Sequence, residues 1–298
     1  MTISLDYTAA AKALALVFNQ IFGRYIADFV HALAAPTTSL LQIYLLATKD
    51  AVNGGDFTAT PVIAEFEPIV SIAADTGLVA VAVWGAYRLM FGHGVRTRYT
   101  VRILLPRLAV AAFLIQFSQL LFQIAVDFTN ALDQAVTGTQ TTQAFGLPDA
   151  RWWEAILGKS EAEVLILLVL LAGYGVLALA YTVRYALLVL LAITAPLAAL
   201  LFILPETHHY ARKWGSLVVS SLFMQPLQLL ILAVALRLET TAGFFPVQHL
   251  YPLAALWLCL KVPGALHDTS TIAGRAMTQA KHVAHAVTHT TGRHPSHA

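Results

Sequence analysis

The sequence predicts an all-α, polytopic membrane protein with about five net transmembrane crossings and an N-terminal amphipathic helical hairpin. Two observations lead to this fold class: the composition and five long apolar runs. Of the 298 residues, 58% are hydrophobic and only 11% are charged. Soluble domains carry about 25% charged residues. The chain therefore has more apolar surface than one soluble core can bury, which excludes an ordinary soluble globular protein and a disordered one.

The predicted spans follow from counting charges, because a transmembrane helix needs about 20 consecutive apolar residues. The runs with few or no charges are Ile69–Met90, Leu108–Val126, Val164–Leu204, Trp214–Leu236 and Phe244–Leu260. As a single helix the third run would be about 60 Å long, twice the thickness of the hydrocarbon core. We expect a break at Ala195-Pro196, where proline removes a helix hydrogen bond, or a boundary at Arg184. Residues Tyr185–Leu204 are then a second pass, a re-entrant piece or a helix within the oligomer.

The distribution of Lys and Arg predicts the orientation. No acidic residue lies between Asp75 and Asp127, and the basic loop in that stretch is expected in the cytoplasm. Its arginines are Arg96, Arg98, Arg102 and Arg107. The following loop, 127–163, has six acidic and two basic residues, net −4, and is expected outside. The segment from Lys261 onward is net +3. We predict a multi-pass protein of the bacterial inner (cytoplasmic) membrane, with its N-terminus outside and its C-terminus inside.

Three regions are expected: N-terminal amphipathic helices in 1–60, a transmembrane bundle in 61–266 and a polar, His-rich cytoplasmic tail in 267–298. Apolar residues recur at helical spacing over 9–33, and Pro36 is expected to end that helix. A second helix over Thr38–Val52 is expected to stop at Asn53-Gly54-Gly55, a turn signal. This hairpin is interpreted as lying on the outer membrane surface or against neighbouring subunits, with Phe18 and Phe22 as oligomer contacts. A first transmembrane helix is the alternative.

Enzyme motifs were sought and not found in the sequence. It has no G-x-x-x-x-G-K-[ST], H-E-x-x-H or G-x-S-x-G, so we predict neither an enzyme nor a cofactor. Cys259 lies in an apolar run and is interpreted as a buried small hydrophobe rather than a catalytic thiol. On a helix, His282, His285 and His289 would share one face and could bind zinc or nickel. No carboxylate or cysteine joins them, so the tail is interpreted as having no fixed metal site.

Two intramembrane charges, Asp75 and Arg184, are the candidate polar site of the bundle. Such charges are costly and face the bundle interior or a wet cavity, so both are candidates for a hydrophilic conduit or a transport site. A structural pair, or an arginine that extends to the interface, is the alternative. Their predicted depths differ, so they are not paired with each other. The small residues Gly173, Gly175 and Ala195-x-x-x-Ala199 predict close helix approach.

The stretch 184–226 is RYALLVLLAITAPLAALLFILPETHHYARKWGSLVVSSLFMQP. This stretch resembles the TrbL-type inner-membrane subunit of conjugative type IV secretion systems. The resemblance rests on an arginine before a long apolar helix, followed by Ala195-Pro196, Pro205-x-Thr207, a basic turn ending in Trp214 and a proline-interrupted span. The likeness is best over 164–262. The short His-rich tail departs from the family, and the first 60 residues match no motif of it.

The resemblance implies a structural channel and assembly subunit that helps move DNA-protein or protein substrate and assemble the pilus. Implied partners are the secretion ATPase, a bitopic assembly subunit and a minor pilin, with transient contact to translocated DNA or protein. Pro196 and Trp214 would be a structural hinge and an anchor, and Arg184 would face the oligomer interior. A five-span chain cannot enclose a polymer-wide pore alone, so we expect a homo-oligomer in membrane lipid. The alternative is a secondary transporter or ion channel with Asp75 and Arg184 as its site.

Overall fold

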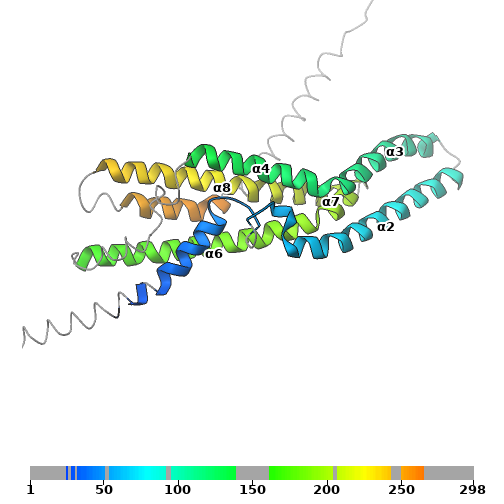
Figure 1. The fold of residues 1–298 in the computed structure, drawn as a ribbon. Helices are drawn as coiled ribbons and strands as arrows, with labels where there is room; N and C mark the ends of the chain where they lie inside the picture. Colours follow the sequence, from blue (N-terminus) through cyan, green and yellow to red (C-terminus); the bar gives the residue numbers. More distant parts are fainter. Residues whose placement is uncertain are drawn as a thin grey trace, which may run out of the picture.

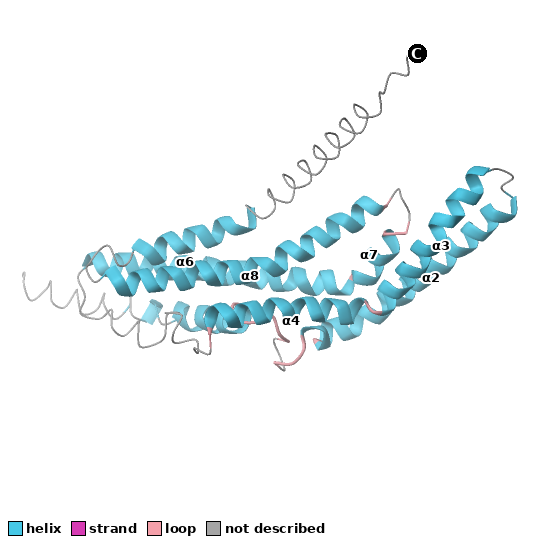
Figure 2. Ribbon diagram, turned by 90° about the horizontal axis from the view of Figure 1, so that it is seen from above, coloured by secondary structure: helices cyan, strands magenta, loops and turns pink. Residues whose placement is uncertain are grey.

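The structure is a computed structural model that describes residues 25, 28–30, 32–50, 54–91, 95–138, 161–203, 207–242 and 250–264. Within these ranges every regular element is a helix and no strand occurs, which confirms the predicted all-α class. Figure 1 shows an elongated bundle, and two helices form a neighbouring antiparallel pair that extends from one of its ends (Figure 1, Figure 2).

The helices along the chain are residues 32–44, the 3-10 helix η1 (Phe57–Ala59), α2 (Pro61–Phe91), α3 (Val95–Gln116), α4 (Ser118–Thr137), α6 (Glu161–Ile193), α7 (Ala195–Leu201), α8 (His208–Ala242) and the C-terminal helix Leu250–Gly264. The extending pair consists of α2 and α3, while α4, α6 and α8 form the body of the bundle (Figure 1).

Three helices are long and apolar enough to cross a membrane: Pro61–Tyr87 in α2, Leu165–Ile193 in α6 and His208–Glu239 in α8. The bent pair formed by α3 and α4 makes a fourth if it counts as one span. The polytopic membrane class is therefore confirmed. The C-terminal helix has 15 described residues, fewer than a full crossing needs. Five net crossings, the fifth at Phe244–Leu260, stay a prediction.

The break in the long apolar run lies where the proline predicts it. Helix α6 continues through Arg184 to Ile193, and the chain turns at Thr194 into α7, which carries Pro196 in its first turn. Proline suits this position because the first turn of a helix does not need its missing N–H. The alternative boundary at Arg184 is wrong, and residues 185–203 form the end of α6, the short α7 and a turn.

The predicted span Leu108–Val126 includes a 66° bend between α3 and α4, and it is a crossing if the bent pair counts as one span. Phe117 lies between them with φ −103° and ψ 10°, outside the helical region. The Ser118 hydroxyl donates to the carbonyl of Ile115 at 2.9 Å, competing with the regular helix ladder. Gln119 donates to the carbonyl of Ala192 at 3.0 Å, which fixes the bend against α6.

Two expected loops are partly helical. The predicted basic loop from Arg96 to Arg107 lies within α3, which begins at Val95. Arginine is a good helix former, and the interspersed apolar residues let the helix continue. Residues 127–137, at the beginning of the predicted outside loop 127–163, belong to α4. Charge marks where a span is expected to end, not where a helix ends, and the sides of the membrane on which these two segments lie stay predictions.

The N-terminal region is not a surface hairpin in its described part. The helix of residues 32–44 continues through Pro36, so the predicted end there is wrong, and so is the predicted second helix Thr38–Val52, which has ended before Asp50. Four apolar side chains at helical spacing are buried in the bundle: Val30, Ala34, Leu41 and Leu45. Their burial, at roughly 1.5–3 kcal/mol for each large side chain, offsets the proline penalty of about 3 kcal/mol. The predicted turn is confirmed at Gly54, which has φ +67° and donates its N–H to Asp50 at 2.9 Å.

Candidate functional site: a buried polar cluster around Arg184

Arg184 lies almost fully buried inside the bundle, where it borders an open, mostly apolar pocket of about 440 Å³. The side chain is 6% exposed, on the part of α6 that packs against α8. Its Nε donates to the carbonyl of Ser221 in α8 at 2.7 Å, and its Nη2 donates to the Thr48 hydroxyl at 3.3 Å. The guanidinium also lies 5.7 Å from the ring centroid of Tyr181, one turn earlier on α6. The alternative of an arginine that extends to the membrane interface is therefore wrong.

Thr48 lies in an irregular segment that enters the bundle between these helices. Asn130 of α4 binds both of its backbone groups: the Thr48 N–H donates to Oδ1 at 2.8 Å, and Nδ2 donates to the Thr48 carbonyl at 3.0 Å. The Thr48 hydroxyl donates to Oε1 of Gln225 at 2.7 Å. Gln225 in turn donates from Nε2 to the carbonyl of Leu45 at 2.8 Å. Side chains of three helices thus satisfy the polar groups of this segment.

Non-helical backbone at membrane depth is tolerated only where it is buried in protein or lines a cavity. Residues 45–50 meet this condition because Leu45, Thr48 and Asp50 are almost fully buried. Their hydrogen bonds to Asn130 and Gln225 replace those that a helix would supply. We call Arg184, Thr48, Asn130 and Gln225 the polar cluster.

Asp133 adds an acidic group beside the polar cluster. It lies one turn after Asn130 on α4 and is 0% exposed. Neither carboxylate oxygen has a hydrogen-bond donor among the described residues. Arg184 is near enough for the two charges to attract each other, although they form no ion pair within 4.0 Å. The acidic charge beside Arg184 is therefore Asp133, not Asp75.

Helical spacing of buried residues could have indicated Asp133 and Gln225 in the sequence, although counting charges does not. Five buried residues of α4 recur at helical spacing: Ser118, Phe122, Val126, Thr129 and Asp133. Asp133 thus belongs to the core-facing stripe of α4, although it lies beyond the apolar run. Gln225 and Gln228 interrupt an uncharged span three residues apart and are both buried. Paired amides in a predicted span indicate an interior face.

The other intramembrane candidate, Asp75, is not in the polar cluster. It lies partly buried on α2, next to Ala74, whose side chain packs with Ile115 of α3 and Ala199 of α7. The basic residue Arg107 is exposed on α3.

The predicted anchor, Trp214, donates from Nε1 to the Thr194 hydroxyl at 3.1 Å. This bond holds α8 against the break between α6 and α7.

The small residues that predict close helix approach do not all lie against a neighbouring helix. A Cβ at Gly173 would lie 2.9 Å from Leu256 of the C-terminal helix, so the predicted close packing is confirmed there. Gly175 has no atom within 4 Å of that point. Ala195 and Ala199 are buried, as their spacing predicts. Helix α2 also approaches α7 closely at Gly77, where a Cβ would lie 2.6 Å from the Leu200 side chain. Gly77 was not among the predicted positions.

Cys259 is fully buried, which confirms its predicted place among the apolar side chains. Its thiol donates to the carbonyl of Gln228 at 3.7 Å, and Gln228 donates to the carbonyl of Cys259 at 2.7 Å. The described residues include no group of three or more metal-ligand side chains. The histidine candidates His282, His285 and His289, like Phe18 and Phe22, lie outside the described residues.

No family model, no curated protein and no solved structure matches the chain. The likeness to TrbL-type subunits therefore rests on the motif in residues 184–226. Within that motif, Arg184 belongs to the polar cluster, and Pro196 lies in the first turn of α7, directly after the helix break. Trp214 makes the hydrogen bond to Thr194 at that break.

Proposed function

We propose that the chain is a structural subunit of an oligomeric inner-membrane conduit in a type IV secretion machine, and not an enzyme. The observation that carries this proposal is the contrast between a bundle interior filled with hydrogen-bonded side chains and open apolar faces. Arg184, Thr48 and Gln225 are buried and hydrogen-bonded together in the middle of the bundle. A path for a polymer would then run between subunits rather than through one.

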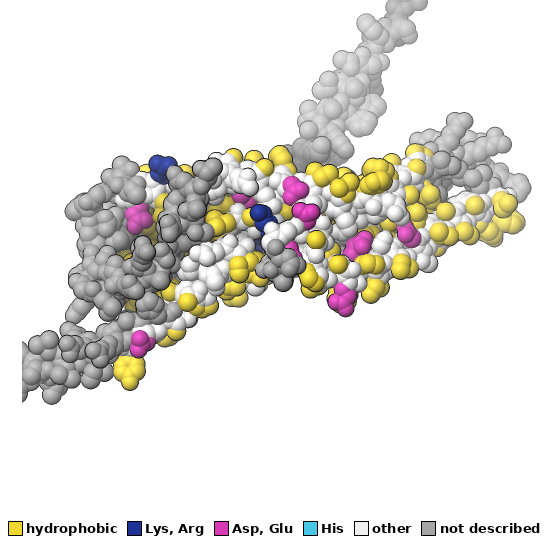
Figure 3. All heavy atoms as spheres, in the orientation of Figure 1, with side chains coloured by type: hydrophobic (Ala, Val, Ile, Leu, Met, Phe, Trp, Pro, Cys, Tyr) yellow, Lys and Arg dark blue, Asp and Glu magenta, His cyan; other side chains and the backbone are white. Residues whose placement is uncertain are grey.

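The open faces are most extensive on α2. Only 11% of its most apolar stretch is buried, against 39% in α6 and 44% in α8. The large apolar side chains exposed on this helix include Phe66, Ile69, Ile72, Val79, Val83 and Tyr87. Hydrophobic side chains also cover much of the face drawn in Figure 3. Lipid and neighbouring subunits are the two environments that accept such a surface.

The proposed partners are those that the TrbL resemblance implies: the secretion ATPase, a bitopic assembly subunit and a minor pilin. Translocated DNA or protein would contact the oligomer transiently. Arg184 takes a structural place in this proposal, because its Nε and Nη2 groups connect α6 to Ser221 of α8 and to Thr48 within the same chain.

Mass measurement of the native complex tests this proposal. Purified in mild detergent, the protein is expected as a closed oligomer, with a mass several times 32.2 kDa, that co-purifies with a secretion ATPase. Polar substitution of Phe18 and Phe22 should lower the oligomer fraction while the protein still inserts. A stable monomer from cells in which the machine is active would contradict the proposal.

The proposed orientation has a separate test. On a Cys259→Ala background, a thiol at Gln140 should react with an impermeant reagent from outside, and one at Thr290 should react only after the membrane is opened. The physical reason is the net charge of −4 in 127–163 and +3 from Lys261 onward. Labelling at position 290 in intact cells would contradict five net crossings.

A secondary transporter or ion channel is the second candidate, and Asp133 is the observation that favours it. Asp133 is a buried carboxylate close to Arg184 that has no hydrogen-bond donor among the described residues, and such a group could bind and release a proton. In this candidate function the site consists of Arg184 and Asp133, whereas the sequence predicted Arg184 and Asp75. Reconstituted monomers that move small ions would support it.

A further inference from the structure

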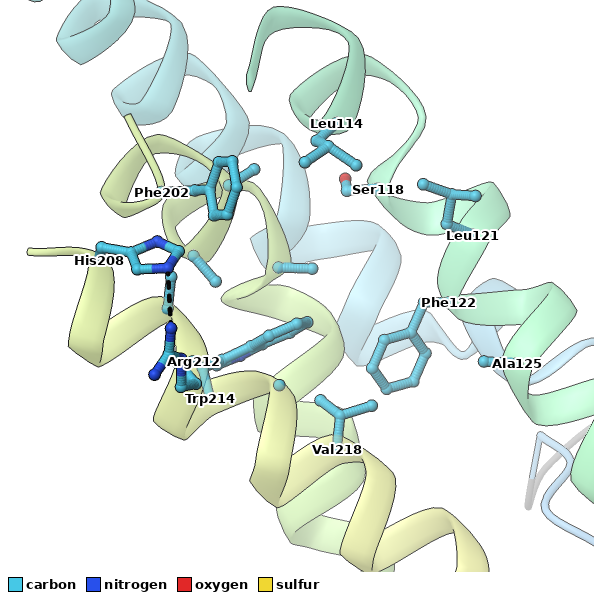
Figure 4. A pocket seen from close by; sticks show the side chains of 15 residues that line it. Leu114, Ser118, Leu121, Phe122, Ala125, Phe202, His208, Arg212, Trp214 and Val218 are labelled. Carbon is cyan, nitrogen blue, oxygen red and sulfur yellow. Dashed lines mark hydrogen bonds between the residues drawn. The ribbon is translucent and has the colours of Figure 1, made fainter. Parts of the chain in front are cut away.

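An apolar groove of about 500 Å³, which no residue of the polar cluster lines, lies where α7 and the first turns of α8 face the bend between α3 and α4. Figure 4 shows Leu114, Leu121, Phe122 and Val218 directed toward this space. Alanines and a glycine make up most of the rest of its wall: Ala125, Ala195, Ala198, Ala199, Ala211 and Gly215. Its volume is in the range of about 300–1,000 Å³ that small-molecule sites occupy.

One rim of the groove is basic. His208 and Arg212, one turn apart on α8, both border it, and their Nε2 and Nη2 atoms lie 3.5 Å apart (Figure 4). The ring of Phe202 packs edge-on against His208, with centroids 4.8 Å apart, and fixes its position. Arg212 is exposed and has no carboxylate partner among the described residues. Its charge therefore remains available to an anion.

The depth of this rim in the membrane follows from the span. The membrane-spanning part of α8 begins at His208, so His208 and Arg212 lie within its first turns, near the level of lipid phosphates. Basic pockets between transmembrane helices commonly hold anionic lipid headgroups. The body of the groove is apolar and continues from the rim toward Phe122 and Val218.

We propose that this groove binds an anionic phospholipid, with the phosphate on Arg212 and His208 and an acyl chain along the apolar wall. The charge distribution selects this occupant over a helix of a second copy, because a basic rim with an apolar body matches the two ends of a lipid. A lipid bound in the groove would contact both the bend between α3 and α4 and the break between α6 and α7, and so would stabilise their packing. This inference does not depend on the proposed secretion function.

Filling the groove tests the acyl-chain part of the proposal. Gly215 lines the groove, and a Cβ there meets no atom within 4 Å, so the side chain of Gly215→Leu begins in open space and is expected to occupy part of the groove. Gly175→Leu is the matched control, because it also meets no atom within 4 Å but does not border the groove. Each purified variant is titrated with phosphatidylglycerol or phosphatidylcholine, and bound lipid is counted by native mass spectrometry. Gly215→Leu should lose the tightly bound lipid, and Gly175→Leu should keep it.

Removing the charge tests the headgroup part. Arg212→Gln should reduce the preference for phosphatidylglycerol over phosphatidylcholine about tenfold, as expected for one charge-assisted contact. Lys213→Gln, on the exposed neighbouring residue outside the groove, should change it little. Inorganic phosphate should compete only weakly, because it lacks the acyl chain.

Three results would overturn the proposal. Equal binding of the two lipids to the unmodified protein would remove the headgroup site. Full displacement by inorganic phosphate would remove the acyl-chain site. A Gly215→Leu variant that changes the oligomer mass but keeps its lipid would assign the groove to a second copy. If Gly215→Leu fails to fold, Arg212→Gln alone decides the outcome through the lipid preference.

Discussion

Replacing Asn130 with leucine is expected to release the segment of residues 45–50 from the bundle. Asn130 satisfies both backbone groups of Thr48, the N–H at 2.8 Å and the carbonyl at 3.0 Å. Leucine branches at the same carbon atom but can bind neither group. A buried polar group left without a partner costs about 1–3 kcal/mol, so the two together cost roughly 2–6 kcal/mol. This is a large part of the stability of an ordinary domain, which is about 5–15 kcal/mol.

Backbone hydrogen exchange measures this effect directly. In the Asn130→Leu variant, amides of residues 45–50 should exchange faster, while those in the middle of α6 should keep their protection. Gln134→Leu is the matched control, because Gln134 lies on the same helix with an exposed side chain. Unchanged exchange of residues 45–50 in Asn130→Leu would mean that other contacts hold the segment.

The membrane class and the main spans were predictable because they depend on local composition. A stretch such as Trp214–Leu236 can be recognised from its own residues, and the structure places it inside α8. The break before Pro196 was predictable for the same reason, since proline acts on its own turn of helix. The confirmed turn at Gly54 is likewise a property of a few adjacent residues.

The parts that could not be predicted depend on contacts between distant residues. Pro36 does not end its helix, because Leu41 and Leu45 gain burial against α6 and α8 that the local sequence does not contain. The bend at Phe117 is fixed by Gln119 bonding to Ala192, 73 residues away. Each of these depends on tertiary packing, which outweighs local propensity.

The polar cluster is the clearest case. Arg184 was a candidate because a charge in an apolar run is visible in the sequence. Thr48 and Asn130 were not candidates, because a threonine in an expected N-terminal hairpin and an asparagine in an expected loop have ordinary surface compositions. Their 82-residue separation hides the pair of hydrogen bonds between them.

The Arg184 and Asp133 side chains are expected to stabilise the bundle jointly rather than separately. Removing either partner of a buried charge pair leaves the other uncompensated and costs about 3–5 kcal/mol, whereas replacing both with apolar side chains is often neutral. Arg184→Met and Asp133→Leu should therefore each destabilise the protein. The double variant should lose less than the sum, by about 0.5–3 kcal/mol. Unfolding in detergent measures the four free energies.

Arg184→Lys separates charge from geometry in the same series. Lysine keeps the charge, but one ammonium group cannot reproduce the bond of Nε to Ser221 and that of Nη2 to Thr48. This variant should be destabilised, although Asp133 keeps a positive neighbour. An Arg184→Lys protein as stable as the original would mean that these two hydrogen bonds contribute little.

The double variant also discriminates between the two proposed functions. In a structural subunit, Arg184→Met/Asp133→Leu restores a neutral interior, so the oligomer should assemble and substrate transfer should continue. In a proton-coupled transporter the same variant removes the group that binds the proton, so transport should stop although the protein folds. Asp75→Asn is the control, because Asp75 lies on α2 outside the polar cluster. A double variant that folds and assembles but does not transfer substrate would contradict a purely structural role of the pair. In that case the two charges would be needed for something other than folding and assembly.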